Sequence, residues 1–305
     1  MARHSRLRVA FGPAVTGWGS WDWVGLDIAR ALQTHFEVTL FDALRIPPCD
    51  VLCVIKHVPP ATMWQALPTD LRVIFAPVDA YGAVAEIDRD APWLRRCQRI
   101  VVHCERLRRF FAPYAPVEFL DHHVKYVGHP SYNAPPDGPL LWIGVRSNLT
   151  PLVQWVNTNQ LPRPLVILTN PDDPSHPFSP EEAGFCGRNR VNILTWSAQL
   201  HHSVLTRCAA ALDVKGTDFR ARHKPPAKAI DFLAAGMPLA MNPDSSSVEH
   251  LANMGFDLCD CHQVDRWLSA EYRNETRHLG AALRELLSLP RIAFRWRKLI
   301  EDVAT

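Results

Sequence analysis

An excess of charge of either sign is missing from this sequence: 33 Lys and Arg are balanced by 31 Asp and Glu, for a formal net charge of +2. That balance excludes the general electrostatic attraction of a nucleic-acid coat protein, and no nucleic-acid partner is expected. Long hydrophobic runs are also missing, because none approaches the roughly 20 residues that a membrane span needs. The segment 1–8 leads directly into a strand-like run without the apolar core of a signal peptide.

Glycine is scarce, and cysteine forms no framework. The 14 glycines are outnumbered by 26 prolines, and the eight cysteines lie far apart, with Cys53, Cys97 and Cys208 in apolar runs. We therefore expect the cysteines to be small core residues of a reduced, cytoplasmic protein. With 305 residues, of which 47% are hydrophobic and 21% charged, the chain is globular in composition and long enough for two domains.

Short apolar runs alternate with helical patterns along the chain, which is typical of parallel, doubly wound sheets. In the first half, strands are predicted at 8–11, 37–41, 51–55, 71–76, 100–103 and 117–120, and helices at 23–32, 60–67 and 105–111. After a linker rich in Pro and Gly at 127–139, strands are predicted at 140–145, 165–169, 191–194, 212–214 and 239–242, and helices from 150 and at 203–210 and 227–235. A surface loop is predicted at 170–180.

This order of elements predicts an α/β fold of two Rossmann-like domains that face each other across a cleft. The N-terminal domain would span 1–130 and the C-terminal domain 131–290. A helix at 291–305 sets apolar residues against basic ones. It would either pack back across the domain junction or hold the protein at the surface of an anionic membrane.

The strongest local signal is the segment from His223 to Pro238. Two prolines begin a short helix and Gly236 ends it. Lys224, Lys228 and Asp231 follow at spacings of four and three. Two ammonium groups at a helix start suit a diphosphate, and a carboxylate one turn later can accept hydrogen bonds from ribose hydroxyls. The alternative is an exposed Lys–Asp pair with a purely structural role.

This segment resembles the donor-binding segment of sugar-nucleotide glycosyltransferases with the GT-B fold, in particular the retaining group that carries Glu-Ala-hydrophobic-Ala-x-Gly-x-Pro. The resemblance implies a nucleotide-sugar donor and retention of anomeric configuration. That group has two Glu separated by seven residues. Here Asp231 stands at the second position and His223 at the first. His223 is therefore a candidate catalytic residue that departs from the pattern.

Two further loops follow predicted strands, where ligands of parallel sheets bind. Arg146, Ser147 and Asn148 precede a helix that begins near Thr150, and the helix start together with Arg146 could bind phosphate. Near the N-terminus, the loop 16–20 carries Gly17 and Gly19, which permit close approach to the donor. Its Trp18 and Ser20 are candidate acceptor contacts. The loop lacks the third glycine of a dinucleotide fingerprint, which disfavours a nicotinamide dehydrogenase.

Polar residues also end the N-terminal strands. Asp79 is the best candidate for acid–base work or for orienting the acceptor, and His57 and His122 are candidate acceptor contacts. No metal site is predicted, because His122 and His123 lack further ligands at suitable spacing and the cluster at 259–262 has no second pair of ligands. Glu249 has capping-box spacing with Ser246 and is a secondary donor-site candidate.

We conclude from the sequence that the protein is a glycosyltransferase that needs no cofactor and no metal, since cationic side chains can stabilise the leaving diphosphate. Its acceptor would be a saccharide, a lipid-linked sugar or a protein. The alternatives are a nucleotide-sugar epimerase or hydrolase of the same fold, and a non-catalytic subunit, which the histidine at position 223 favours.

Overall fold

The computed structural model describes residues 6–15, 17–42, 45–127, 135–170 and 178–305. By their contacts, residues fall into two compact units. The first comprises 1–123, 223–226 and 287–305, and the second comprises 124–222 and 227–286. The chain therefore passes from one unit to the other at several points, and its last helix belongs to the first unit.

The first unit is built on a parallel six-stranded sheet in the order β2-β1-β3-β4-β5-β6. Its strands are mostly buried apolar runs, as expected where helices cover both faces. The strands are β1 (Arg8–Gly12), β2 (Glu37–Leu40), β3 (Val51–Ile55), β4 (Arg72–Ala76), β5 (Arg99–Val102) and β6 (Val117–Phe119).

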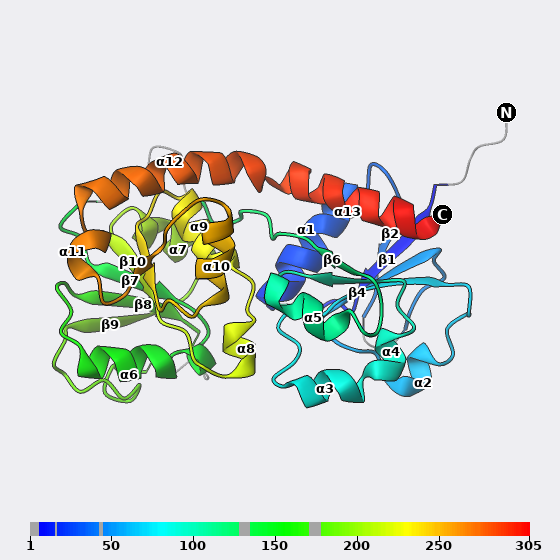
Figure 1. Cartoon of the computed structure of the whole chain (residues 1–305), viewed down its shortest axis with the longest axis horizontal. Helices are drawn as coiled ribbons and strands as arrows, with labels where there is room; N and C mark the ends of the chain where they lie inside the picture. Colours follow the sequence, from blue (N-terminus) through cyan, green and yellow to red (C-terminus); the bar gives the residue numbers. More distant parts are fainter. Residues whose placement is uncertain (1–5, 16, 43–44, 128–134, 171–177) are drawn as a thin grey trace. The chain divides into compact units, whose positions relative to one another are not determined.

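Helices lie on both faces of this sheet, with α1 and α13 on one face and α3, α4 and α5 on the other (Figure 1). The apolar stripe of α13 buries Ile292, Trp296 and Ile300, and the helix packs against α1. The helices are η1 (Trp21–Leu26), α1 (Asp27–Leu32), α2 (Ala61–Trp64), α3 (Val84–Arg89), α4 (Ala91–Leu94), η2 (Glu105–Leu107), α5 (Arg108–Phe111) and α13 (Leu289–Ala304).

The second unit repeats the plan with the strand order β12-β11-β10-β7-β8-β9, again all parallel. Figure 1 shows α6 on one face of the sheet and α9 with α12 on the other. The strands are β7 (Leu140–Ile143), β8 (Leu165–Thr169), β9 (Val191–Thr195), β10 (Ala210–Asp213), β11 (Leu239–Met241) and β12 (Cys259–Asp260). The helices are η3 (Arg146–Asn148), α6 (Thr150–Thr158), α7 (Ala198–Leu205), α8 (Phe219–Arg222), α9 (Ala227–Ala234), α10 (Ser246–Asn253), α11 (Val264–Trp267) and α12 (Ala270–Leu286).

The two sheets confirm the predicted pair of Rossmann-like α/β folds, whereas their arrangement across a cleft stays a prediction. One helix prediction is wrong. The helix expected at 203–210 is α7, which begins earlier because the Ser197 hydroxyl accepts the N–H of Leu200. It ends at Leu205, and the following residues enter β10. Among the described residues, no helix is both long and apolar enough to cross a membrane.

The packing of α12 on α9 yields a stability prediction. A Cβ placed on Gly280 of α12 would lie 2.3 Å from the backbone oxygen of Leu233 in α9. Gly280→Ala should therefore lower the free energy of unfolding by roughly 2 kcal/mol, although Ala is the better helix former by about 1 kcal/mol. Urea unfolding measures the change. A stabilised Gly280→Ala protein would contradict the close packing. Ala281→Gly at the exposed neighbouring position is the control, with a loss of about 1 kcal/mol from helix propensity alone.

Candidate functional site

The strand order of the second unit reverses between β7 and β10. The chain proceeds from β7 outward through β8 and β9 and then returns to β10 on the other side of β7. In open parallel sheets, ligands bind beyond the carboxyl ends of the strands at such a point. The residues that end these two strands are Ile143 and Asp213, so the site is built from what surrounds them.

Two lysines meet Asp213 at this point. The Lys215 ammonium lies 2.6 Å from Asp213 Oδ2, and Lys228 Nζ lies 3.4 Å from Asp213 Oδ1. Lys228 Nζ also donates a hydrogen bond of 2.7 Å to the carbonyl oxygen of Ile143, which ties α9 to the end of β7. The structure thus brings the predicted donor residue Lys228 to the position where the strand order reverses.

Asp213 is charged although it is buried, with only 2% of its surface exposed. Burial by itself would raise the pKa of its carboxyl group, but the ammonium groups of Lys215 and Lys228 outweigh that effect and lower the pKa to about 2. A buried carboxylate needs such partners, because an unpaired charge in a protein interior is strongly unfavourable. Asp213 therefore fixes two cationic side chains at one sheet edge.

Gly144 and Trp142 pack against the ammonium group of Lys228. A Cβ on Gly144 would lie 2.6 Å from the ring of Trp142 and 3.3 Å from Lys228 Nζ. The Trp142 ring centre lies 5.1 Å from Lys228 Nζ, a cation–π distance. Only glycine at position 144 leaves room for the ring and the ammonium group at the end of β7.

The other residues of the predicted donor segment take different places. His223 and Lys224 belong to the first unit, where the His223 ring meets Phe110 edge-on at 5.4 Å. The roles predicted for His223 and Lys224 therefore stay predictions.

Asp231 has a role that the sequence did not reveal. Its carboxylate is buried and accepts hydrogen bonds from the backbone N–H groups of Lys125 (2.9 Å) and Tyr126 (3.3 Å). Burial raises the pKa of Asp231 to about 7, against the lowering effect of those N–H groups. Asp231 thus anchors the backbone just after the chain enters the second unit, and its predicted contact with a ribose stays a prediction.

The loop after β7 differs from the free helix start that the sequence predicted. Arg146, Ser147 and Asn148 form the 3₁₀ turn η3, which runs directly into α6. The N–H groups of Asn148 and Leu149 already donate within this turn, to Val145 and Arg146. The Arg146 guanidinium lies 4.0 Å from the centre of the Phe178 ring. The N–H groups of Asn148 and Leu149 are therefore not available to a phosphate, and the predicted contacts of Arg146, Ser147 and Asn148 with the donor stay predictions.

Glu249 lies on the first turn of α10 and is exposed. The predicted capping box with Ser246 is wrong, because the helix is capped by Ser245, whose hydroxyl accepts the N–H of Ser247. The cap is therefore one residue earlier than predicted.

The first unit has its own reversal of strand order, between β1 and β3. Trp18 follows β1 and is 45% exposed, and Lys56 and His57 follow β3 directly. Gly17 precedes Trp18 with a φ of 80°, whereas Gly19 and Ser20 lead into η1. Thr16 lies outside the described residues. This edge therefore gathers the predicted acceptor contacts Trp18 and His57.

Two residues other than glycine at this edge have a left-handed backbone conformation. Lys56 has a φ of 64° and Asp79, after β4, a φ of 52°. Such conformations cost roughly 1–2 kcal/mol for residues other than glycine. The Asp79 Oδ1 atom is also buried without a hydrogen-bond partner among the described residues. Strained backbone and unsatisfied buried polar atoms are concentrated at functional sites, so these two residues make this edge a second candidate site.

His122 requires a correction. It is 4% exposed, and its ring stacks on that of His103 at 4.4 Å, beside Trp23. A ring that is buried in this way presents no surface to an acceptor, so the predicted acceptor contact of His122 is abandoned. Burial lowers the pKa of both rings, that of His103 to about 4.

The triplet Asp260, Cys261 and His262 at the end of β12 brings potential ligand atoms within 4.8 Å of one another. Two of the three residues are engaged in hydrogen bonds within the protein. Asp260 Oδ1 accepts the N–H of His262, and His262 Nε2 accepts the indole N–H of Trp155. We assign no metal to it.

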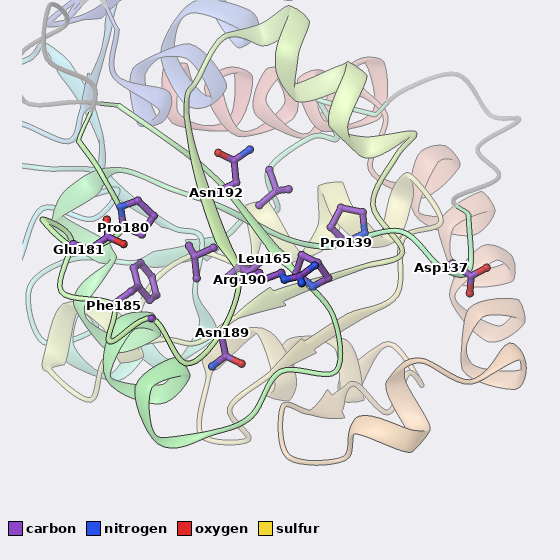
Figure 2. A pocket seen from close by; sticks show the side chains of 13 residues that line it. Asp137, Pro139, Leu165, Pro180, Glu181, Phe185, Asn189, Arg190 and Asn192 are labelled. Atoms are coloured by element: carbon purple, nitrogen blue, oxygen red, sulfur yellow. The ribbon is translucent and has the colours of Figure 1, made fainter.

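A cavity of about 590 Å³ lies at the opposite edge of the second sheet. It is lined by Leu165 and Val191, the first residues of β8 and β9, and Figure 2 shows Arg190, Asn189 and Asn192 around it. This cavity is remote from the carboxyl ends of the strands, where helix starts and the lysines lie, so it is distinct from the candidate site.

The buried ion cluster predicts an effect on stability. Asp213→Ala should lower the free energy of unfolding by about 3–5 kcal/mol, because it leaves two ammonium groups together without their shared acceptor. Urea unfolding at pH 7 measures this. Asp302→Ala, which removes the exposed carboxylate from an ion pair with the partly exposed Arg99, is the matched control and should cost at most about 1 kcal/mol. Equal losses in the two variants would contradict the account.

The buried histidines predict acid sensitivity. Because the pKa of His103 is about 4 in the folded protein and near 6.5 when unfolded, the unfolded state binds more protons between these values. The contribution of His103 to folding stability is therefore complete above pH 6.5 and is lost as the pH falls towards 4. His103→Asn keeps a donor for the carbonyl of Leu120, which His103 Nδ1 contacts at 2.6 Å.

Between pH 7 and pH 5 the His103→Asn protein should lose about 2 kcal/mol less stability than the unaltered protein. Urea unfolding at both pH values gives the difference. His35→Asn, the same change at an exposed histidine, is the matched control. An identical pH dependence for His103→Asn and the unaltered protein would show that His103 does not titrate as described.

Comparison with known proteins places the fold. No protein-family model and no curated protein matches this chain by sequence. Among solved structures, AviGT4, a glycosyltransferase involved in avilamycin A biosynthesis, is 14% identical with a TM-score of 0.64, and the match covers 98% of each chain. An α-glucosyltransferase solved in complex with UDP is 10% identical (TM-score 0.63, covering 98% of this chain and 100% of the other).

WaaG, a glycosyltransferase involved in lipopolysaccharide biosynthesis, is 11% identical, with a TM-score of 0.61 and coverage of 96% of this chain and 99% of the other. These matches span nearly the whole chain and both sheets. They confirm the predicted fold class, which is the GT-B architecture of two Rossmann-like units.

Proposed function

We propose that the protein is a glycosyltransferase that takes its sugar from a nucleoside diphosphate sugar. The observation that carries the proposal is the pair of ammonium groups, Lys215 and Lys228, fixed by Asp213 at the reversal of strand order in the second unit. The likeness in fold to glycosyltransferases supports the same class of reaction.

The charge of this site suits a diphosphate. When the bond between the sugar and the diphosphate breaks, negative charge grows on the leaving phosphate oxygens. Cations already held in place stabilise that charge without reorganisation at the moment of reaction. Lys228 is fixed by the Ile143 carbonyl and Asp213, so its ammonium group is positioned before the donor binds. On this account the reaction proceeds without a metal, and a chelator leaves its rate unchanged.

Other residues complete the proposal at a finer level. Arg146 would contribute a third cation beside the diphosphate, after Lys215 and Lys228, and Lys224 a fourth. Gly17, Gly19, Ser147, Asn148 and Glu249 would line the donor. Asp79 and His223 are proposed for the chemistry, and Trp18, Ser20 and His57 for the acceptor. Retention of anomeric configuration, which the donor-segment resemblance implies, belongs to this proposal as well.

Calorimetric titration with UDP, GDP, TDP and ADP tests the donor site. At least one nucleotide should bind, and at 100 times its dissociation constant it should stabilise the fold by about 2.7 kcal/mol. Lys228→Met, Lys215→Met and Lys224→Ala should each weaken that binding at least tenfold, since each removes a cation. The affinity, not the melting temperature, is the measurement, because the first two changes also alter the buried cluster.

The control is Lys298→Met on α13, which removes an exposed ammonium group 5.4 Å from the centre of the Phe294 ring and should leave nucleotide affinity unchanged. Hydrolysis or transfer from the matching nucleotide sugar, measured with and without EDTA, then tests catalysis and the need for a metal. The NMR coupling constant of the anomeric proton in the product reports retention or inversion. If none of the four nucleotides binds, the proposed donor site is wrong.

A further inference from the structure

The first unit carries a cationic–aromatic cluster at its own reversal of strand order. Trp18 follows β1, and Lys56 and His57 follow β3, the two strands between which the order reverses. This is the position where ligands of such sheets bind. A transferase needs a second substrate in addition to its donor, and this edge lies in a different unit from the lysine pair.

The three side chains contact one another. The Lys56 ammonium lies 4.4 Å from the centre of the Trp18 ring, within cation–π distance. The His57 ring meets Trp18 edge-on, with ring centres 5.4 Å apart and planes at 72°. Trp18 nevertheless remains 45% exposed, so a large apolar ring is held in a fixed place without the stabilisation of full burial.

The backbone indicates that this placement is selected for function. Lys56 adopts the left-handed conformation, with φ of 64°, in which glycine would be the unstrained residue. Its N–H still extends the sheet by donating to the carbonyl of Ala76, so the sheet itself makes no demand for a lysine side chain here. A lysine in place of glycine therefore gives up stability and gains an ammonium group at the strand end.

The chemistry of the cluster defines its ligand. An exposed indole ring stacks on the flat face of a sugar or an aromatic ring, and an ammonium group beside it attracts an anionic substituent. The pKa of His57 is lowered by burial and by the charge of Lys56, so its imidazole is neutral at pH 7 and can both donate and accept hydrogen bonds.

We infer that Trp18, Lys56 and His57 form a recognition site for an acceptor whose ring carries a phosphate or a carboxylate. That the ligand is an acceptor rests on the proposed transferase function. Its binding to this site can be measured without any donor. Lys56 is then the residue that selects charged acceptors over neutral ones.

The test is saturation-transfer NMR titration of the full chain with matched probes, in which inorganic phosphate, which carries no observable proton, is measured by its displacement of a charged ring. The charged rings are glucose 6-phosphate, glucuronate and 4-nitrophenyl phosphate. Methyl glucoside and 4-nitrobenzyl alcohol are the neutral rings. Inorganic phosphate carries the charge without a ring. We expect at least one charged ring to bind ten times more tightly than both its neutral counterpart and inorganic phosphate.

Two variants of Lys56 separate recognition from folding. Lys56→Met should abolish the preference for the charged ring. Trp18→Ala should weaken the binding of charged and neutral rings to the same extent. Lys56→Gly should also abolish the preference while raising the urea midpoint, because it relieves the left-handed strain. Lys298→Met, which removes the comparable pair with Phe294 on α13, should leave the preference unchanged.

The inference is overturned if no charged ring outperforms its neutral counterpart, or if the preference survives Lys56→Met. Phosphate binding as tightly as the charged rings would also overturn it, since the ring would then contribute nothing.

Nucleotide titration of the same proteins distinguishes the two proposals: Lys56→Met should bind UDP or its analogues as the unaltered chain does. If no nucleotide binds, the proposed donor site is wrong, but the measured preference for charged rings would still support this recognition site.

Discussion

A buried carboxylate between two lysines determines the character of the second unit. Asp213 could not remain charged in the interior without Lys215 and Lys228, and the lysines could not lie so close together without Asp213. This mutual dependence holds three elements together: the end of β10, the loop after it, and α9. Because Lys228 also binds the Ile143 carbonyl, the end of β7 joins the same cluster. The cations are thus part of the fold before any ligand arrives.

The elements with local signals were the ones that the sequence predicted well. The helix expected at 227–235 is α9, Ala227–Ala234, because prolines precede it and Gly236, with φ of 76°, ends it. Parallel sheets could be expected from the alternation of apolar runs with helical patterns. By contrast, the helix expected at 203–210 was displaced, since the pattern alone did not reveal that Ser197 caps an earlier start.

The site was less predictable because its contacts join distant parts of the sequence. Lys228 could be singled out from its own segment, but its partners Asp213 and Ile143 lie on two other strands. In the sequence, Asp213 and Lys215 were marked only by their position at the end of an apolar run. That pattern is too common to indicate a site. Asp231 shows the reverse case. Its spacing suggested a ligand contact, whereas its carboxylate is engaged by the backbone of Lys125 and Tyr126, far away in the chain. His122 was misjudged for a similar reason, because only tertiary packing shows that its ring stacks on His103.

The return of the last helix to the first unit has a consequence for biosynthesis. The strands and helices up to residue 123 leave the ribosome early, but α13 is made only after the whole second unit. Until then the surface that receives Trp296 and Ile300 has no cover, and α1 lacks its packing partner. The first unit therefore cannot reach its native state before α13 has been synthesised. Its completion must wait until the chain of the whole second unit has been made.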